Sequence, residues 1–289
     1  MIVTVASGKG GTGKTLVATG LAAVVAESCA VVCLLDCDVE APNAHLFLKP
    51  ALTGCEEVSL PVPQVDLARC TFCGRCAEVC AFHALAVVGR QVLTFAELCH
   101  GCGSCARQCP EGAISEVPRR LGVVEWGWAG RVRLARGVLD VGQAMATPVI
   151  RRLKQRALEG VGGPALVLLD APPGNACAVV ETLRGSDFAL LVTEPTPFGL
   201  HDLEIAVQVA REELGLPVGV VINRDGIGDG GVEGYCAHAG LPILLRIPFD
   251  RRIAAACAAG GLWVDAVPEY REGMRGLYRT LQETGGAAP

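Results

Sequence analysis

Short apolar runs rich in β-branched residues recur along the chain, and each ends in a polar or glycine-rich turn. Such runs are typical of strands that are buried on both faces of a sheet. The expected strands are Ile2–Ala6, Ala30–Leu35, Ala165–Leu169, Phe188–Val192, Val218–Ile222 and Ile243–Ile247. Between most of them lie segments of helical composition, which are Gly13–Glu27, Gly142–Glu159, Leu200–Leu214 and Arg251–Gly260. Alternating strands and helices predict an α/β fold with a parallel sheet and helices on both of its faces.

One region interrupts this alternation. Between residues 61 and 118 the density of cysteine rises, and prolines punctuate the segment. We therefore expect a main domain made of residues 1–60 and 119–289 and an inserted domain made of residues 61–118. Surface loops tolerate such an insertion when its two ends lie close together. The segment that follows, Arg119–Leu139, is expected to be irregular or hairpin-like.

The amino-acid composition limits the kind of core and the kinds of binding partner that we expect. Hydrophobic residues make up 51% of the 289 residues and aromatic residues only 4%, so the core must consist mainly of Val, Leu, Ile and Ala. The formal net charge of −5 gives no electrostatic reason to expect a nucleic acid as partner. No apolar run approaches the roughly 20 residues of a membrane span, and no export signal is found. We therefore expect a cytoplasmic protein without a membrane partner.

A glycine-rich segment between the first expected strand and the first expected helix predicts a phosphate site. It fits the pattern G-x-x-x-x-G-K-[ST], in which backbone N–H groups and a helix N-terminus surround phosphate oxygens. The expected nucleotide-binding residues are Gly8, Lys9, Gly10, Gly11, Thr12, Gly13, Lys14 and Thr15. Lys14 is expected to reach the β- and γ-phosphates, and Thr15 to bind Mg²⁺. The alternative is a glycine-rich turn that only joins a strand to a helix.

Acidic residues follow two other expected strands. Asp170 precedes the sequence Ala-Pro-Pro-Gly, an arrangement that resembles a Walker B strand running into a switch loop. Its carboxylate is expected to hold Mg²⁺ through water, and the N–H of Gly174 to follow the γ-phosphate. Asp36 and Asp38 end the second strand, and alternate residues of a strand point the same way, so both are expected to face the nucleotide. Turn formation alone is the alternative for these acidic residues.

The additional lysine, Lys9, relates the phosphate loop to a particular type of motif. With Lys9 and Lys14 together, the loop resembles the deviant Walker A motif of the MinD/ParA/nitrogenase-iron-protein superfamily, which are SIMIBI-type P-loop NTPases. The resemblance implies an ATPase that dimerises with ATP, in which Lys9 crosses the interface to the nucleotide of the other subunit. It implies catalytic roles for both lysines, with Asp38 positioning the attacking water and Asp36 supporting Mg²⁺. It also implies that Asn223 contacts the adenine. The alternatives are a solvated surface lysine for Lys9 and a turn residue for Asn223.

Two further segments resemble one subgroup of this superfamily. Asp36–Asn43 and Thr193–Gly199 are similar to segments of the MinD-type ATPases that carry an inserted ferredoxin domain. The resemblance covers essentially the whole chain. It implies a homodimer, or a heterodimer with a similar protein, and slow ATP hydrolysis in the absence of the partner.

The inserted segment holds two cysteine runs of identical spacing, C-x-x-C-x-x-C-x-x-x-C. Fifteen cysteines in a cytoplasmic protein indicate metal binding, because a reducing compartment keeps thiols free. The spacing matches the bacterial two-cluster ferredoxins, in which the fourth cysteine of each run ligates the other cluster. The expected [4Fe–4S] ligand sets are Cys70, Cys73, Cys76 with Cys109, and Cys80 with Cys99, Cys102, Cys105. We therefore expect a small α+β ferredoxin-like module. Two Cys₄ zinc sites are the alternative.

Seven cysteines lie outside the two runs. Cys177 follows Asp170 by seven residues, the spacing at which the nitrogenase iron protein places a ligand of its subunit-bridging cluster. A bridging ligand is one interpretation of Cys177, and a core cysteine at a helix start is the other. The thiols expected to be small apolar or incidental side chains are Cys29, Cys33, Cys55, Cys236 and Cys257. His83 and His100 are expected to be loop residues and not ligands.

Three functions are compatible with an ATP-dependent dimer that carries two clusters. In the first, ATP gates electron transfer to a redox partner. In the second, the protein assembles or carries iron–sulfur clusters for a client, although no C-x-x-C pair of the Mrp-type carriers follows Cys109. In the third, a redox-sensing MinD/ParA-like ATPase positions or regulates other molecules. If all eight cysteines of the two runs are ligands, both clusters are fully coordinated by the protein. This favours electron transfer, because a protein that donates clusters needs a labile one.

Overall fold

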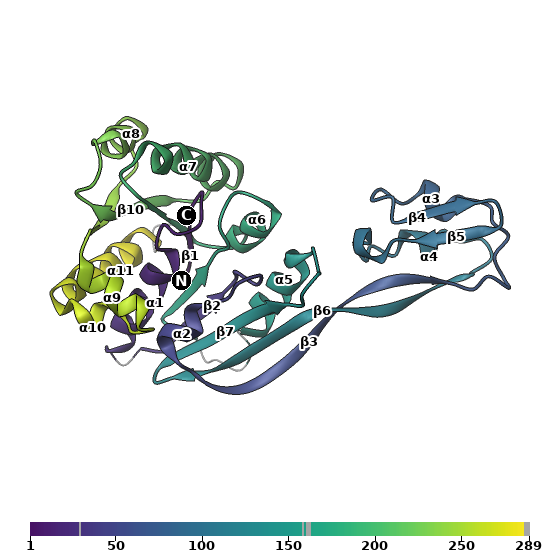
Figure 1. Ribbon diagram of the computed structural model, residues 1–289, viewed down its shortest axis with the longest axis horizontal. Coiled ribbons are helices and arrows are strands. Elements are labelled where there is room, and N and C mark those ends of the chain that lie inside the picture. The colour runs from purple at the N-terminus through teal and green to yellow at the C-terminus, as the bar shows by residue number, and fades with distance from the viewer. Residues whose placement is uncertain (29, 158, 160–162, 286–289) are drawn as a thin grey trace.

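The computed structural model describes residues 1–28, 30–157, 159 and 163–285, so Cys29 lies outside it. Within these residues, nine strands form one sheet in the order β11-β10-β9-β1-β8-β2-β7-β6-β3. Their bounds are β1 (Ile2–Ala6), β2 (Val32–Asp36), β3 (Ala51–Val65), β6 (Ile114–Ala129), β7 (Val132–Leu139), β8 (Leu166–Asp170), β9 (Phe188–Thr193), β10 (Val218–Asp225) and β11 (Ile243–Pro248). From β11 to β7 the strands run parallel, which confirms the expected parallel sheet; β6 and β3 are antiparallel to their neighbours (Figure 1).

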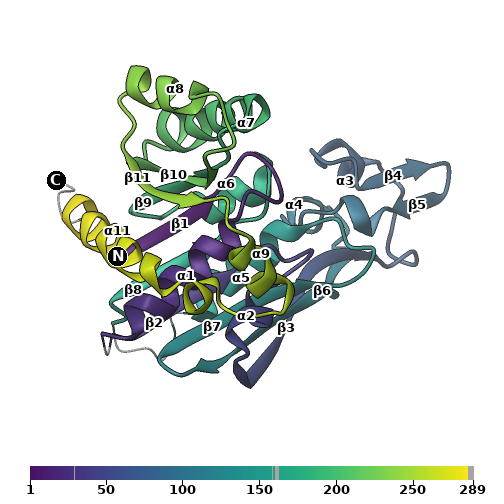
Figure 2. The same cartoon turned by 60° about the vertical axis from the view of Figure 1, so that its left-hand side comes forward.

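Helices cover both faces of this sheet (Figures 1 and 2). One face carries α1 (Lys14–Ala26), α2 (Ala44–Leu48), α9 (Arg251–Ala258), α10 (Trp263–Ala266), η3 (Pro268–Tyr270) and α11 (Arg271–Gly285). The other carries α5 (Ala146–Ala157), α6 (Cys177–Leu183), α7 (Pro197–Val207), the π-helical turn η2 (Gln208–Glu213) and α8 (Gly231–Ala239). Along β2, Leu34 packs into the first layer, and Cys33 and Leu35 pack into the second, as expected for a strand buried on both faces. No helix in the described ranges has the length and apolarity needed to cross a bilayer.

The sequence analysis did not list β3, β6 and β7 among the expected strands of the sheet, although it allowed a hairpin where part of β6 and β7 lie. The β6–β7 pair confirms the hairpin expected near Arg119–Leu139, but β7 also lies beside β2 and extends the parallel sheet. Glutamates and prolines break the apolar pattern of β3, among them Glu56 and Pro61. Proline is tolerated there because β3 is the edge strand and needs ladder hydrogen bonds on one side only.

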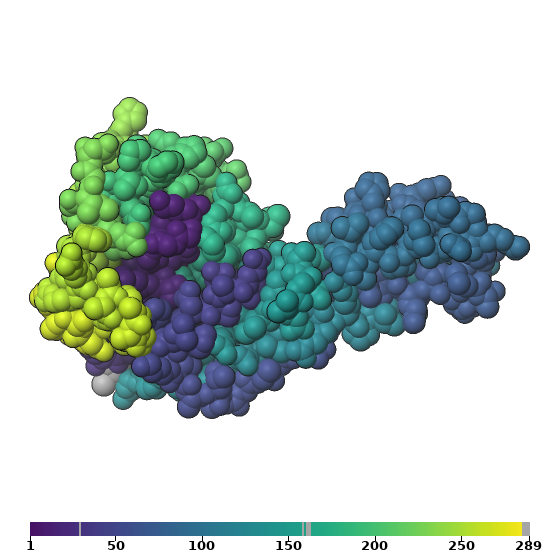
Figure 3. Space-filling model, viewed as in Figure 1, coloured from purple at the N-terminus to yellow at the C-terminus, as the bar shows by residue number. Residues whose placement is uncertain are grey.

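Beyond the sheet, β3 and β6 continue as a two-stranded ribbon that ends in a separate lobe (Figures 1 and 3). Pro61 and Pro118 are paired across this ribbon, and the strands run on to Val65 and Ile114. The ribbon therefore crosses the expected domain boundary, and the lobe itself comprises residues 66–113. Its elements are α3 (Arg75–Glu78), β4 (Leu85–Val88), β5 (Gln91–Thr94), η1 (Ala96–Leu98) and α4 (Ser104–Arg107).

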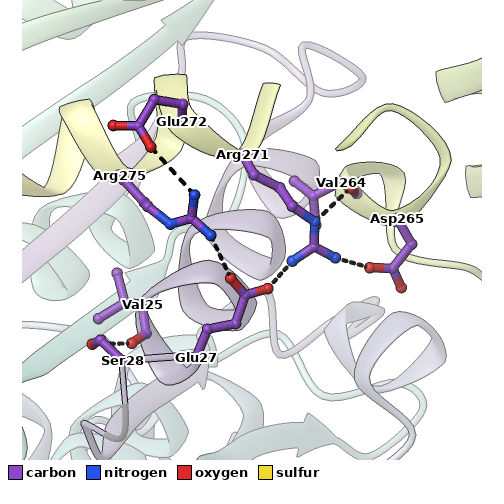
Figure 4. Close-up of polar contacts among 8 residues, drawn as sticks. All are labelled: Val25, Glu27, Ser28, Val264, Asp265, Arg271, Glu272 and Arg275. Carbon is purple, nitrogen blue, oxygen red and sulfur yellow. Dashed lines mark hydrogen bonds and ion pairs between the residues drawn. The ribbon is translucent and has the colours of Figure 1, made fainter. Parts of the chain in front are cut away.

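The C-terminal helix α11 is attached to α1 by two kinds of contact. Its apolar side is fully buried through Met274, Leu277 and Leu281. Its charged side meets Glu27 at the end of α1, which forms ion pairs with Arg271 and Arg275 (Figure 4). Partly exposed ion pairs contribute about 1 kcal/mol or less, so the apolar side should supply most of the stabilisation.

Replacing Leu277 with Ala should lower the free energy of unfolding by about 2–5 kcal/mol, because it removes a fully buried leucine side chain. Replacing Glu27 with Gln should lower it by about 1 kcal/mol or less, since both arginine partners remain partly solvated. Urea unfolding followed by tryptophan fluorescence measures both changes. Equal losses in the two variants would show that the ion pairs, and not the apolar side, hold the helix.

Candidate functional site

The phosphate loop lies between the end of β1 and the start of α1, as the sequence predicted. Lys14 is buried, and its Nζ donates hydrogen bonds to Ser7 Oγ at 3.0 Å and to the carbonyl oxygen of Lys9 at 3.4 Å. Burial lowers the pKa of Lys14, whereas the carboxylates of Asp170 and Asp38 act in the opposite direction. The loop thus holds the Lys14 side chain among its own polar groups, close to the carboxylates of Asp38 and Asp170.

Two carboxylates end neighbouring strands beside this loop. Asp36 and Asp170 are aligned in the register of β2 and β8, and both are almost fully buried. Thr15 Oγ1 donates a hydrogen bond to Asp170 Oδ2 at 2.6 Å. Burial raises the pKa of Asp170 well above its usual range, and repulsion from Asp36 adds to this effect. A divalent cation bound here would relieve the repulsion.

Several buried polar atoms around the loop lack a protein partner. In the part of the chain that the structure describes, they include Asp170 Oδ1, Thr12 Oγ1 and Asn43 Oδ1. Buried polar atoms are nearly always satisfied, so such atoms indicate positions for water, an ion or a ligand. Oxygen donors suit Mg²⁺, and Lys14 and the loop suit phosphate. The residues therefore fit a Mg–nucleotide, and Asn43 is a candidate that the sequence analysis missed.

Asp36 holds the loop that follows β2. Its Oδ2 accepts hydrogen bonds from the N–H groups of Asn43 at 2.8 Å and Ala44 at 2.9 Å, and its Oδ1 accepts one from Asp38 N–H at 3.3 Å. These bonds fix the backbone of residues 37–43, and with it the position of the half-buried Asp38. Burial raises the pKa of Asp36 to about 6. The role of Asp36 beside Mg²⁺ stays a prediction.

Two adjoining cavities flank the loop and share Gly11, Gly13, Leu16 and Cys257 in their walls. The cavity on the phosphate side, of about 340 Å³, is lined by Lys14 and Asp38 among others. The second cavity, of about 170 Å³, is lined by Asn223 and Phe249 among others. Asn223 Nδ2 donates to the carbonyl oxygen of Thr12 at 2.7 Å, and a side chain at Gly13 would collide with the Asn223 amide. Together the cavities suit a nucleotide, with its phosphates on one side and its base on the other.

A buried glutamate, also missed by the sequence analysis, joins Lys9 to the second cavity. Glu194 Oε2 lies 3.7 Å from Lys9 Nζ, and its Oε1 lies 2.6 Å from Arg224 Nη1. The Glu194 side chain is only 9% exposed. Lys9 is therefore paired within its own subunit. The position of Glu194, directly after a buried parallel strand, could have identified it, because ligand sites gather at the carboxyl ends of such strands.

The segment after Asp170 carries the expected switch residue and Cys177. Gly174 has a left-handed backbone (φ 94°), and its N–H donates to the carbonyl oxygen of Ser7 at 3.3 Å. The switch segment thus rests against the phosphate loop. Cys177 is exposed at the first position of α6, and its bridging role stays a prediction.

The cysteines of the two runs surround two hollows in the lobe. The first is lined by Cys70, Cys73, Cys76 and Cys109. The second is lined by Cys80, Cys99, Cys102 and Cys105. Each hollow takes three cysteines from one run and the fourth from the other. These groups are the two ligand sets expected from the spacing.

Backbone donors surround the thiols in a repeated pattern. The N–H···S bonds run from Phe72 to Cys70 and from Gly101 to Cys99 at 3.4 Å, from Ala84 to Cys80 at 3.2 Å and from Ala113 to Cys109 at 3.3 Å. Such donors stabilise thiolates and tune the potential of a bound cluster. Among the described residues, no three His, Cys, Asp or Glu side chains converge on one metal ion.

A family model of the CobQ/CobB/MinD/ParA nucleotide binding domain matches residues 3–262. The chain belongs to this family. It is therefore a MinD/ParA-type P-loop ATPase, as the deviant Walker A motif indicated. The family match concerns the ATPase domain and leaves the inserted lobe to be interpreted from its own residues.

Relatives and solved structures of this family extend over nearly the whole chain. The uncharacterized protein MJ0579 of Methanocaldococcus jannaschii is 32% identical over 266 residues, which cover 90% of each chain. The cytosolic Fe-S cluster assembly factor NUBP2 homolog of Culex quinquefasciatus is 26% identical, over 93% of this chain and 91% of the relative. The septum site-determining protein MinD of Pyrococcus horikoshii OT3, complexed with Mg-ADP, has a TM-score of 0.60 at 19% identity, over 99% of this chain and 97% of that one. At this identity the structural likeness shows the fold.

The raised pKa of Asp36 predicts a pH dependence of stability. Asp36 titrates at about 6 in the folded protein and at about 3.9 in an unfolded chain, so between these values the folded state binds more protons. This group should therefore lower the free energy of unfolding by up to about 3 kcal/mol as the pH rises from about 4 to about 6. Asp36→Asn removes the contribution, so the wild-type stability should decline relative to the variant over this interval. Urea unfolding of both nucleotide-free proteins across the pH range measures this, and parallel curves would contradict the prediction.

Proposed function

We propose that this chain is an ATP-binding and ATP-hydrolysing dimeric switch whose nucleotide state gates electron transfer through two [4Fe–4S] clusters to a partner protein. The observation that carries the proposal is the crossed arrangement of the thiols around the two hollows. A cluster that takes its fourth ligand from the other run ties both loops together, so its loss would loosen the whole lobe. Clusters held in this way are suited to remain in place and carry electrons.

The residues gathered at the phosphate loop support the ATPase part of the proposal. Lys14 would contact the β- and γ-phosphates, and Thr15 with Asp170 would hold Mg²⁺. Asp38 is close enough to Lys14 for the lysine to influence its pKa, and it would orient the attacking water. In the proposed dimer, Lys9 leaves its own subunit and contacts the nucleotide of the other. The other subunit of the proposed dimer is an identical or a similar chain.

The inserted lobe supports the redox part. In this proposal residues 61–118 are the cluster domain, and the clusters supply one-electron transfer when bound. The protein's own part is to supply eight thiolates and the N–H donors that tune them. The lobe stands away from the ATPase body at the end of the ribbon, where a partner protein can reach it (Figure 3).

The name of one relative favours a second candidate function. The Culex quinquefasciatus protein that is similar over 93% of this chain is named a cytosolic Fe-S cluster assembly factor. In that case the ATPase would drive the assembly of clusters, or their transfer to a client protein. The two candidates differ in whether the clusters leave the protein.

Anaerobically purified protein should contain about eight irons per chain, four for each expected cluster. After reduction with dithionite, EPR should show two interacting [4Fe–4S]⁺ signals. Mg-ATP should change these signals while the mass in solution shifts to that of a dimer. Clusters that move to an apo-ferredoxin on addition of Mg-ATP would support the assembly function instead. Clusters that neither respond to Mg-ATP nor leave would contradict both candidates, and bound zinc without a signal would overturn the cluster assignment.

Pairs of serine substitutions test the crossed ligand sets. Cys70→Ser with Cys109→Ser removes two ligands from one expected site, so about four irons and one isolated EPR signal should remain. Cys99→Ser with Cys109→Ser removes one ligand from each site, so both signals should be disturbed. The reverse result would assign Cys109 to its own run. Cys55→Ser changes an exposed thiol outside both runs, so it is the matched control and should keep the wild-type iron content.

A further inference from the structure

Arg119 lies where the ribbon joins the ATPase body, and it binds both sides of the junction. On the lobe side its Nη1 donates to the carbonyl oxygen of Ala96, and its Nη2 lies 3.9 Å from Glu97 Oε1. On the body side its Nη2 donates to Gln143 Oε1 at 2.6 Å. The Arg119 side chain is 17% exposed, so these contacts are largely shielded from solvent. The planar guanidinium presents its donors in a rigid fork, so Arg119 can hold both partners in a fixed geometry.

On the lobe side, Arg119 contacts the segment that directly precedes one of the two cysteine sites. The short helix η1 begins at Ala96, and the N–H of Cys99 donates to the carbonyl oxygen of Ala96 at 3.2 Å. Cys99 is the most buried thiol of the set that also contains Cys80, Cys102 and Cys105. The loop that follows it packs on the ribbon, since a side chain at Gly101 would collide with Leu60. We name this set the proximal site.

The other site lies farther from the body. The hollow lined by Cys70, Cys73, Cys76 and Cys109 also borders Val65 and Ile114, the last paired residues of the ribbon. Near it, Arg69 Nη2 donates to the carbonyl oxygen of Glu111 at 2.8 Å, a contact inside the lobe. We name this set the distal site. Arg119 therefore contacts the surroundings of the proximal site and not those of the distal one.

On the body side, the contacts continue to the switch segment. Gln143 lies in the loop that precedes α5. From α5, Arg151 pairs with Glu181 of α6 at 3.0 Å. Lys154 donates to three carbonyl oxygens at the end of α6, those of Glu181, Thr182 and Arg184. The helix α6 begins just after the switch segment that rests on the phosphate loop. Polar contacts of Arg119, Arg151 and Lys154, joined by short stretches of chain before α5 and before α6, thus connect the switch segment to Cys99.

We infer that Arg119 is a positioning residue that couples the nucleotide state of the ATPase body to the proximal site and leaves the distal site unaffected. Movement of α6 with the switch segment shifts α5, and Arg119 passes that shift to η1 and the Cys99 loop. Coupling of this kind requires contiguous contacts and an element with two arrangements, here the switch segment. The inference rests on the proposed function, because it assumes resident clusters and a response to nucleotide.

The test is an EPR-monitored redox titration of the cluster-loaded full chain with Mg-AMP-PNP or Mg-ADP. In the wild type, the midpoint potential of one cluster should shift between the two nucleotides. The shift should persist in the Cys70→Ser/Cys109→Ser variant, which keeps the proximal site, and be absent from a Cys80→Ser/Cys99→Ser variant, which keeps the distal one. Arg119→Ala should abolish the shift while nucleotide affinity and iron content stay at wild-type levels.

Matched variants separate coupling from damage to the fold. Arg120→Ala changes the next residue of the same strand, whose side chain pairs with Asp140 and Glu57 instead of with the lobe, and it should keep the shift. Gln143→Ala breaks the same link from the body side and should abolish the shift even if Arg119→Ala loses iron. A wild type without any shift would overturn the proposed function. A wild-type shift that survives in both Arg119→Ala and Gln143→Ala would overturn the role of Arg119 and leave the proposed function standing.

Discussion

The nucleotide site depends on two carboxylates that end neighbouring strands inside the protein. Asp36 and Asp170 face each other across β2 and β8, where burial and mutual repulsion both oppose ionisation. The surrounding loops supply hydrogen-bond donors to both carboxyl groups. Backbone N–H groups of the loop after β2 converge on Asp36, and Thr15 donates to Asp170. The two loops are therefore built around buried carboxyl groups whose mutual repulsion a bound cation would relieve.

The lobe at the end of the ribbon faces a different constraint. Its buried apolar residues are few, with Val62, Ala84 and Cys99 forming a small cluster against the ribbon. A segment of this size cannot gain enough from apolar burial to fold securely by itself. Eight thiols around two hollows offer the alternative, since ligand bonds to resident clusters would replace the missing core. In the proposed function the ribbon would carry a unit stabilised by its clusters.

The ribbon is also the connection between the lobe and the ATPase body. A two-stranded ribbon alone would be a compliant connection, because only one ladder of hydrogen bonds holds it. Arg119 adds a side-chain link between the lobe and the loop before α5, on the route that leads through α6 to the switch segment. Glu194 adds a second link within the body, between Lys9 and Arg224 at the base-side cavity. Single charged side chains therefore link the lobe to the body, and Lys9 to the base-side cavity.

The sequence by itself determined the features that depend on residues close together in the chain. Apolar runs identified most parallel strands, the glycine-rich loop identified the phosphate site, and cysteine spacing identified both groups that line the hollows. The strands β3 and β6 escaped prediction because their polar and proline residues carry no apolar pattern, and their stability comes from pairing across more than sixty residues at the Ala51–Trp128 end. The positions of Glu194 and Arg119 were likewise decided by the tertiary structure. Their partners lie on other elements, and a charge acquires its role only when folding brings its counter-charge within a few ångströms.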